Sequence, residues 1–237
     1  MERRDFVRAC ALAGAAASLP ELIGQALAQG AAKPQLYGRA RLVDANGRAL
    51  KSKTVPVGQN LIFHYPFQGT PCFLLNLGRP TRTSVTLKTN DARSYEWTGG
   101  TGANGALVAY SAICAHKLTY PTRDISFISY RTEKTPGNKF TRVIHCCSEH
   151  SQYDPADGGR VLAGPAPQPL AAILLDYDQT ADELYAMGTV GGEMFDEFFA
   201  KYEFRLQMEH GGRQKAAVEG ACVVTELEDY CRQQVKC

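Results

Sequence analysis

The sequence lacks three features that would each point to a particular class of protein. It has no apolar run of about 20 residues, the length that a membrane-spanning helix needs, which excludes a helical membrane bundle. Its charges are balanced, with 26 Lys and Arg against 24 Asp and Glu and no basic stripe, so nucleic acid is not an expected partner. It has no low-complexity tract, and hydrophobic residues make up 44% of the chain, which excludes a disordered protein.

Tryptophan is also scarce, whereas turn-forming residues are frequent. The chain has one Trp but 22 Gly and 12 Pro, and these separate many short apolar runs. Such a pattern favours a turn-rich β protein over a helical bundle. Strand-length segments fall at residues 36–44, 61–65, 71–77, 84–88, 106–113, 124–131, 140–144, 171–176 and 184–188. Helical spacing appears only near the end, at residues 194–204. We therefore predict an all-β fold with a short C-terminal helical extension.

The first 28 residues have the pattern of a bacterial export signal. Adjacent arginines, Arg3 and Arg4, precede an uncharged Ala-rich run at 9–19, and a small-x-small cleavage site follows at 26–28. The pattern resembles a twin-arginine signal, a route that carries folded proteins, often around a cofactor. We predict a signal peptide at 1–28 and a periplasmic location, where disulfides persist. The alternative is an uncleaved amphipathic helix, which the clustering of the arginines at one end disfavours.

Two cysteines and two histidines follow two of the predicted strands at short spacing. The strand 106–113 leads into Cys114-Ala115-His116. A second strand ends at His145 and leads into Cys146-Cys147-Ser148-Glu149-His150. C-x-H followed by C-x-x-H resembles the ligand pattern of Rieske 2Fe-2S proteins, in which two thiolates hold one iron and two imidazoles hold the other.

A third element extends this resemblance. Gly164-Pro165-Ala166-Pro167 is similar to the proline loop that covers the cluster in Rieske proteins of the cytochrome bc type, and the likeness runs from about residue 106 to 188. The resemblance implies an antiparallel β sandwich with a small cluster-binding subdomain. We accordingly expect a Rieske domain at 29–194 and a C-terminal extension at 195–237.

The resemblance also implies a ligand set: thiolates from Cys114 and Cys147, and imidazoles from His116 and His150. The nearby hydroxyl groups that could hydrogen-bond to the cluster are those of Ser148, Ser151 and Tyr153. We interpret His145 as a strand-end histidine that faces solvent or serves as a hydrogen-bond partner.

A second register for the later motif stays open. Counting back from Tyr153 in the bc-type pattern makes Cys146 the thiolate ligand and puts Glu149 where that pattern has histidine. Because a carboxylate matches this position poorly, we prefer Cys147 with a one-residue deletion after His150.

The remaining cysteines do not form an obvious disulfide framework. Seven are left once Cys10 departs with the signal, an odd number that includes an adjacent pair. Bc-type proteins join their two ligand loops by a disulfide, but Thr119 and Glu149 occupy those positions here. We expect a structural disulfide within the tail and a buried Cys72. The tail cysteines are Cys222, Cys231 and Cys237.

The resemblance implies a periplasmic one-electron carrier without substrate chemistry of its own. An oxygen-activating iron would need a further two-His, one-carboxylate site, and the remaining histidines are scattered over unrelated segments. The chain is similar to the small subunit of arsenite oxidase, which implies a larger molybdenum-containing catalytic partner. A c-type cytochrome or a cupredoxin would then accept the electron.

Two alternatives remain. One is a membrane-anchored bc-type Rieske protein that oxidises quinol, with membrane contact only if the signal is uncleaved. The other is a zinc-stabilised binding module, because two Cys and two His can also hold structural zinc.

Overall fold

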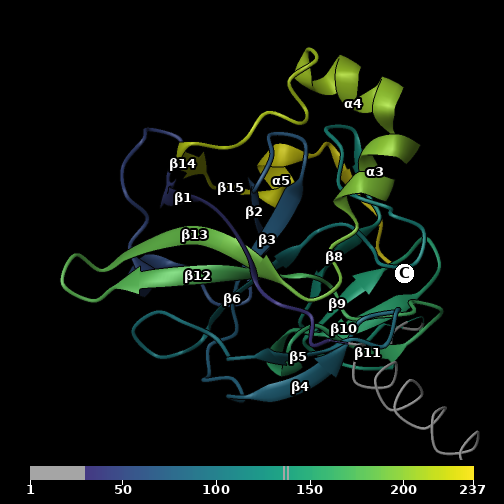
Figure 1. Ribbon diagram of the computed structural model, residues 1–237, viewed down its shortest axis with the longest axis horizontal. Coiled ribbons are helices and arrows are strands. Elements are labelled where there is room, and N and C mark those ends of the chain that lie inside the picture. The colour runs from purple at the N-terminus through teal and green to yellow at the C-terminus, as the bar shows by residue number, and fades with distance from the viewer. Residues whose placement is uncertain (1–29, 136, 138) are drawn as a thin grey trace, which may run out of the picture. The chain divides into compact units, whose positions relative to one another are not determined.

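The computed structural model describes residues 30–135, 137 and 139–237, and the predicted signal peptide at 1–28 lies outside this part (Figure 1). The chain divides into two units, Met1–Ala31 and Ala32–Cys237, and the account below concerns the second. None of the helices in the described part has the length and apolar character that crossing a membrane requires.

A sheet of eight strands forms the larger part of this unit. The strand order is β14-β1-β13-β12-β6-β3-β2-β15, and all neighbours are antiparallel except β1 and β14. The strands are β1 (Gln35–Val43), β2 (Leu61–His64), β3 (Pro71–Asn76), β6 (Leu107–Ser111), β12 (Ala172–Asp178), β13 (Glu183–Val190), β14 (Gly220–Val223) and β15 (Thr225–Glu226). The prediction of an all-β fold is confirmed.

A smaller antiparallel sheet, ordered β11-β10-β9-β8, lies against the large one (Figure 1). Its strands are β8 (Ile128–Arg131), β9 (Val143–Cys146), β10 (Ser151–Asp154) and β11 (Arg160–Ala163). Two strand pairs complete the β structure: β4 (Val85–Lys88) with β5 (Ser94–Trp97), and β7 (Ile125–Ser126) with β16 (Gln233–Gln234). Short 3-10 turns occur at η1 (Ser52–Thr54) and η2 (Pro155–Asp157).

The central strands β3 and β6 of the large sheet are buried on both faces. Successive side chains of a strand point to opposite sides, so each of these strands contributes to two apolar clusters. In β3, Phe73 and Leu75 belong to one apolar cluster, and the alternating residues Cys72 and Leu74 belong to another. The first cluster also contains residues of the small sheet, and it fills the space between the two sheets. Cys114, Cys146 and Tyr153 are members of this cluster.

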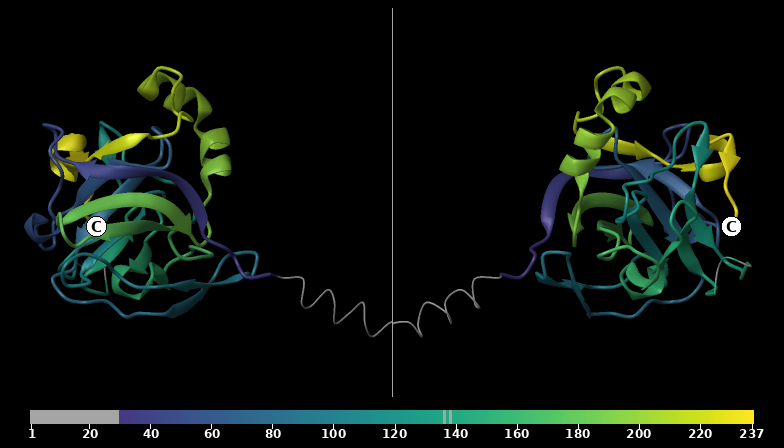
Figure 2. Two further views of the ribbon diagram at one scale, coloured as in Figure 1. Left: turned by 60° about the vertical axis from the view of Figure 1, so that its left-hand side comes forward. Right: turned by 90° about the vertical axis from the view of Figure 1, so that its right-hand side faces the viewer.

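The helical segment is divided in two. The sequence predicts one helix at 194–204, but the structure has α3 (Phe195–Lys201) and α4 (Glu203–His210), with non-helical ψ at Tyr202 between them. Both helices lie outside the sheets (Figure 2).

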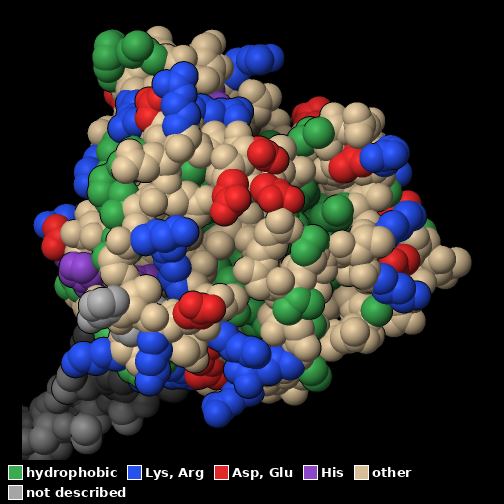
Figure 3. Space-filling view, turned by 180° about the vertical axis from the view of Figure 1, so that it is seen from behind, with side chains coloured by type: hydrophobic (Ala, Val, Ile, Leu, Met, Phe, Trp, Pro, Cys, Tyr) green, Lys and Arg blue, Asp and Glu red, His purple; other side chains and the backbone are tan. Residues whose placement is uncertain are grey.

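The chain then returns to the body of the fold. Strand β14 pairs with β1, β15 pairs with β2, and β16 pairs with β7; the short helix α5 (Leu227–Tyr230) lies between β15 and β16. The C-terminus ends close to β9 (Figure 1). On the face shown in Figure 3, basic and acidic side chains are interspersed.

Candidate metal centre

Two short loops at neighbouring strand ends carry the predicted site. In the first cysteine loop (residues 114–119), the Cys114 N–H donates to the Thr119 carbonyl at 2.8 Å, and the Leu118 N–H donates to the Cys114 carbonyl at 2.9 Å. In the second cysteine loop (residues 146–151), Cys146 pairs with Ser151 across β9 and β10, which leaves 147–150 as the turn. Both loops are closed by main-chain pairing, so their cysteines have fixed positions.

The structure brings the sulfur atoms of Cys114 and Cys146 together. The two thiols hydrogen-bond to each other, both side chains are buried, and neither forms a disulfide. The main-chain N–H groups of His116 and Lys117 donate to the Cys114 sulfur, and those of Ser148 and Glu149 donate to the Cys146 sulfur. N–H donors stabilise negative charge on sulfur, so this pocket suits a pair of thiolates.

Tyr153 supplies a further hydrogen bond to this pair. Its hydroxyl oxygen lies 3.2 Å from the Cys114 sulfur and accepts the Ala115 N–H at 3.1 Å. Because the oxygen accepts from Ala115, the hydroxyl proton is free to point at the sulfur. Tyr153 was one of the three hydroxyl groups that the sequence placed near the site, and its contact with a candidate ligand is confirmed.

The two sulfurs influence each other's protonation. The pKa of Cys114 is lowered, first by the hydrogen bond from Cys146 and also by the one from Tyr153. The pKa of Cys146 is raised because its thiol is the donor of that bond and because it is buried. The pair therefore retains one proton, which a metal cation would displace on binding both sulfurs.

Two other polar atoms at the site are buried without a hydrogen-bond partner. They are Nδ1 of His116 and Oγ of Ser151. An unpaired buried polar atom costs about 1–3 kcal/mol, so such atoms call for an explanation. The His116 ring nitrogen could bind a metal ion, and the Ser151 hydroxyl could hydrogen-bond to a sulfide. Together with the two reduced cysteines, these groups fit an iron–sulfur group. By the chemistry of these donors, the residues present fit the group that the sequence resemblance implies.

The pairing of β9 with β10 shows on which face of the small sheet each neighbouring residue lies. Directly paired residues lie on the same face of a sheet, and adjacent residues lie on opposite faces. Ser151 pairs with Cys146, so both lie on the face toward the core. Gln152 pairs with His145, so both lie on the other face, and Cys147 follows His145 by two residues.

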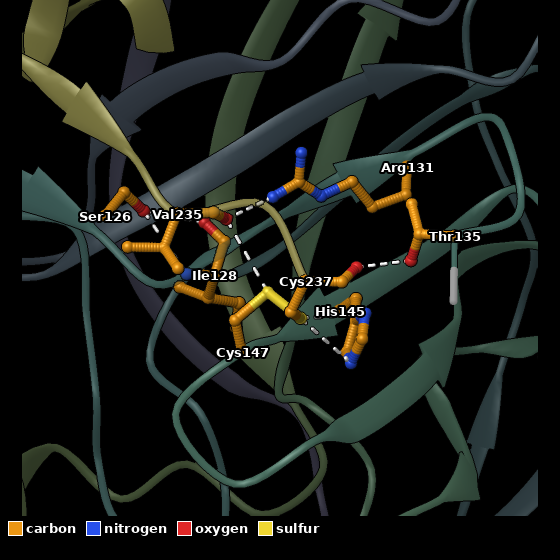
Figure 4. Close-up of a disulfide and its surroundings, with 8 residues drawn as sticks. All are labelled: Ser126, Ile128, Arg131, Thr135, His145, Cys147, Val235 and Cys237. Carbon is orange, nitrogen blue, oxygen red and sulfur yellow. Dashed lines mark hydrogen bonds between the residues drawn. A yellow bond between two sulfur atoms is a disulfide. The ribbon is translucent and has the colours of Figure 1, made fainter. Parts of the chain in front are cut away.

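Cys147 therefore points away from Cys114, and it forms a disulfide with Cys237 (Figure 4). The Cα atoms of the two cysteines are 5.8 Å apart. A sulfur in a disulfide offers no thiolate, so the structure contradicts the preference for Cys147 as a ligand. Cys146, the alternative that the sequence left open, is the cysteine beside Cys114.

The same bond corrects the expected disulfide within the tail. Cys237 bonds to Cys147, while Cys222 and Cys231 are buried free thiols. The tail carbonyls are also held, since Arg131 donates to the Val235 carbonyl and Thr135 donates to the Cys237 carbonyl (Figure 4). Ninety positions separate the bonded cysteines, and no local pattern in the sequence pairs them.

His145 and His150 lie beside this disulfide. His145 is fully buried, not facing solvent, and both of its ring nitrogens are 3.7 Å from the Cys237 sulfur. The rings of His145 and His150 have centroids 5.7 Å apart. Burial lowers the pKa of His145 to about 4, with smaller contributions from the neighbouring His150 and Arg131. The three side chains of His145, His150 and Cys237 thus form a group on the disulfide face.

The proline loop (residues 164–167) packs against the second cysteine loop. Gly164 has φ of +86°, and a Cβ there would lie 2.5 Å from the His150 carbonyl oxygen and from the Ser151 Cα. Only glycine permits this approach. Ala166 packs against the apolar cluster that contains Cys114 and Cys146.

An ion pair also joins the two cysteine loops. Lys117 Nζ of the first loop lies 2.5 Å from Glu149 Oε1 of the second. The pKa of Glu149 is lowered, chiefly by Lys117, with smaller contributions from His116 and His150.

Fold and site together define an all-β protein with a candidate metal centre at the tips of two loops. Among solved structures, the chain is similar to the soluble domain of the Rieske protein II (soxF) from Sulfolobus acidocaldarius. The two are 28% identical over 65% of this chain and 78% of that chain, with a TM-score of 0.43. No family model matches the chain.

Proposed function

We propose that this protein is a one-electron carrier with a Rieske-type 2Fe-2S cluster. The observation that carries the proposal is the buried, reduced pair of Cys114 and Cys146, next to a histidine whose Nδ1 has no partner. The C-x-H spacing and the proline loop support it from the sequence.

Different residues of the chain would bind the two irons of such a cluster. Cys114 and Cys146 would bind one iron. His116, through Nδ1, and His150, the second imidazole that the sequence resemblance implies, would bind the other. When bound, the cluster supplies a site that accepts and releases a single electron. Tyr153 and the main-chain N–H donors would stabilise the more negative reduced state and so would raise the reduction potential.

The two ends of the site differ in their access to solvent. Both cysteine side chains are buried, whereas His116 is partly exposed. A redox partner can therefore approach the imidazole edge but not the thiolate end. The chain would therefore present the His116 edge of the site to a redox partner.

The cellular setting belongs to the same proposal. We place the protein in the periplasm, as small subunit or partner of a larger oxidoreductase similar to the molybdenum enzyme arsenite oxidase, passing electrons to a c-type cytochrome or cupredoxin. The support is the sequence pattern at 1–28 and the resemblance to that small subunit. Purification of the native complex from the periplasm, followed by identification of the proteins that accompany this chain, tests the setting.

The cluster itself is tested on full-length protein purified without oxygen. We expect iron and acid-labile sulfide in equal amounts and a 2Fe-2S paramagnetic signal after reduction. Cys114→Ser should abolish both, whereas Cys222→Ala, at another buried free cysteine outside the site, should retain them. Colourless protein that holds zinc and no iron would overturn the proposal.

A further inference from the structure

We propose that a pocket formed mainly by the C-terminal extension binds a small oxyanion, with the Arg123 guanidinium as its principal partner. We call it the tail pocket, and its lining residues are His64, Gln68, Arg123, His210, 217–219 and 221–223. None of them belongs to the two cysteine loops or to the proline loop. The inference therefore goes beyond the proposed function and does not depend on the cluster.

The tail pocket lies where the tail crosses from one edge of the large sheet to the other. Strand β14 pairs with β1 at one edge, and β15 pairs with β2 at the other (Figure 1). The pairing with β2 involves only Thr225 and Glu226, and it does not extend to His64, the last residue of β2. A cavity of about 320 Å³ remains between these segments. This volume is within the range of small-molecule sites.

Arg123 supplies a positive charge that no acidic group of the protein neutralises. Its guanidinium carbon lies 4.4 Å from the centre of the Tyr230 ring, a cation–π contact that favours one position of the side chain. No carboxylate among the described residues forms an ion pair with it, and the adjacent Asp124 pairs with Arg232 at 3.2 Å. A guanidinium has five N–H donors in a planar arrangement that matches an oxyanion. These donors are available to a ligand in the pocket.

Two histidines add uncharged donors beside Arg123. The ring centroids of His64 and His210 are 5.8 Å apart. The Tyr230 hydroxyl lies 3.3 Å from Nε2 of His64, which leaves Nδ1 for a ligand. Burial lowers the pKa of His64 to about 3, with smaller contributions from His210 and Arg123, and the pKa of His210 is also lowered, chiefly by burial. Neutral imidazoles do not repel Arg123, and each carries one N–H that can donate to an anion.

The other lining residues define what kind of anion the tail pocket fits. The amide of Gln68 adds a further donor, whereas Glu219 is the one acid of the lining and acts against an anion. One guanidinium, two imidazoles and one amide thus face a single carboxylate, and this balance favours an oxyanion over a cation. Ala217, Ala221 and Val223 offer apolar surface. The oxyanion is therefore either inorganic or the head of a molecule with a short apolar chain.

The test is calorimetric titration of full-length protein with sodium sulfate, sodium phosphate and sodium butyrate, at an ionic strength held constant with sodium chloride. We expect saturable binding of at least one of these anions. Tighter binding of butyrate would identify an organic anion as the ligand, and tighter binding of sulfate or phosphate would identify an inorganic one. The cation n-butylamine, which has the same chain as butyrate, should not bind.

Variants assign the binding to the tail pocket. Arg123→Gln should weaken it by about tenfold or more, because charge-assisted hydrogen bonds are lost. Glu219→Gln should strengthen it, because a repelling charge is removed. Arg213→Gln is the matched control, since Arg213 is an exposed arginine of the same tail that does not line the pocket. Thermal unfolding shows that each variant is folded; if Arg123→Gln is not, Arg123→Lys keeps the charge without the planar donors and should also weaken binding.

Four results would overturn the inference. They are the absence of saturable binding for all three anions, binding of n-butylamine as tight as that of butyrate, an unchanged affinity in the folded Arg123 variant, and an equal loss of affinity in Arg213→Gln. The last would show a general effect of charge and not a site. Protein without iron and sulfide would overturn the proposed function and leave this inference standing, because the titration does not involve the cluster.

Discussion

Two adjacent cysteines, Cys146 at the end of β9 and Cys147 directly after it, have completely different surroundings. Cys146 faces the core between the sheets and lies reduced beside Cys114, whereas Cys147 faces the other way and is oxidised in a bond to Cys237. The reason is that neighbouring residues of a strand point to opposite faces. A shift of one residue therefore separates a buried free thiol beside Cys114 from a cysteine in a structural crosslink.

The largest effect should come from removing one or the other of these two cysteines. Cys146→Ser should abolish the iron, the sulfide and the visible absorption of the purified protein, because it removes one of the two thiolates that we propose bind iron. Cys147→Ser should retain all three, because its sulfur contributes only to the crosslink. Iron and sulfide analysis of the two variants side by side measures this, and loss of the cluster in Cys147→Ser alone would reverse our assignment.

The next effect concerns the disulfide. Breaking it with Cys237→Ser should lower the free energy of unfolding by about 2–4 kcal/mol, because a crosslink spanning 90 positions restricts the unfolded chain. Urea denaturation of the oxidised wild type and the variant measures the change. Cys231→Ser is the matched control, as it alters another buried tail cysteine without touching the bond. Equal stability of Cys237→Ser and wild type would show that the crosslink is absent or without effect.

A smaller effect should appear as acid sensitivity on the disulfide face. The folded pKa of His145, about 4, lies below its unfolded value of about 6.5, so the unfolded chain binds a proton in this window that the folded protein does not. Stability should therefore fall as the pH drops from about 6.5 toward 4, by at most about 1.4 kcal/mol per pH unit from this group. In His145→Gln this contribution disappears. Unfolding curves at pH 7 and pH 5 compare the two proteins, and an identical pH dependence would contradict burial of a neutral His145.

The smallest effect should be on the reduction potential. Tyr153→Phe removes the hydroxyl that hydrogen-bonds to the Cys114 sulfur, and the potential should fall by on the order of 50 mV, since 59 mV corresponds to about 1.4 kcal/mol for one electron. Tyr110→Phe is the control, because its buried hydroxyl donates to the Pro155 carbonyl and not to sulfur. Voltammetry that finds both variants at the wild-type potential would show that Tyr153 does not tune the site.

The local features of this protein could be predicted from the sequence. The apolar runs at 61–65, 71–77 and 106–113 became β2, β3 and β6, with ends within two residues of the prediction. Cys114 lies in a loop directly after a buried strand, as predicted. These features depend on neighbours in the chain, namely apolar periodicity and turn-forming residues, and so are visible in one sequence. Strands β5, β10 and β11, and the three tail strands β14, β15 and β16, were not predicted. Strand propensity depends strongly on the pairing partner, which the composition of a single segment does not reveal.

The choice between Cys146 and Cys147 was beyond the sequence, although the sequence contained both. Spacing favoured Cys147, since C-x-x-H then ends at His150. The structure favours Cys146 instead. Cys146 pairs with Ser151, and Cys147 is bonded to the tail cysteine Cys237. Side-chain direction at the end of a strand depends on register with the next strand, and a crosslink depends on which distant segment packs alongside. Both are properties of the folded chain. The sequence therefore determined which kinds of ligand are available, and the tertiary structure determined which of those side chains lie next to one another.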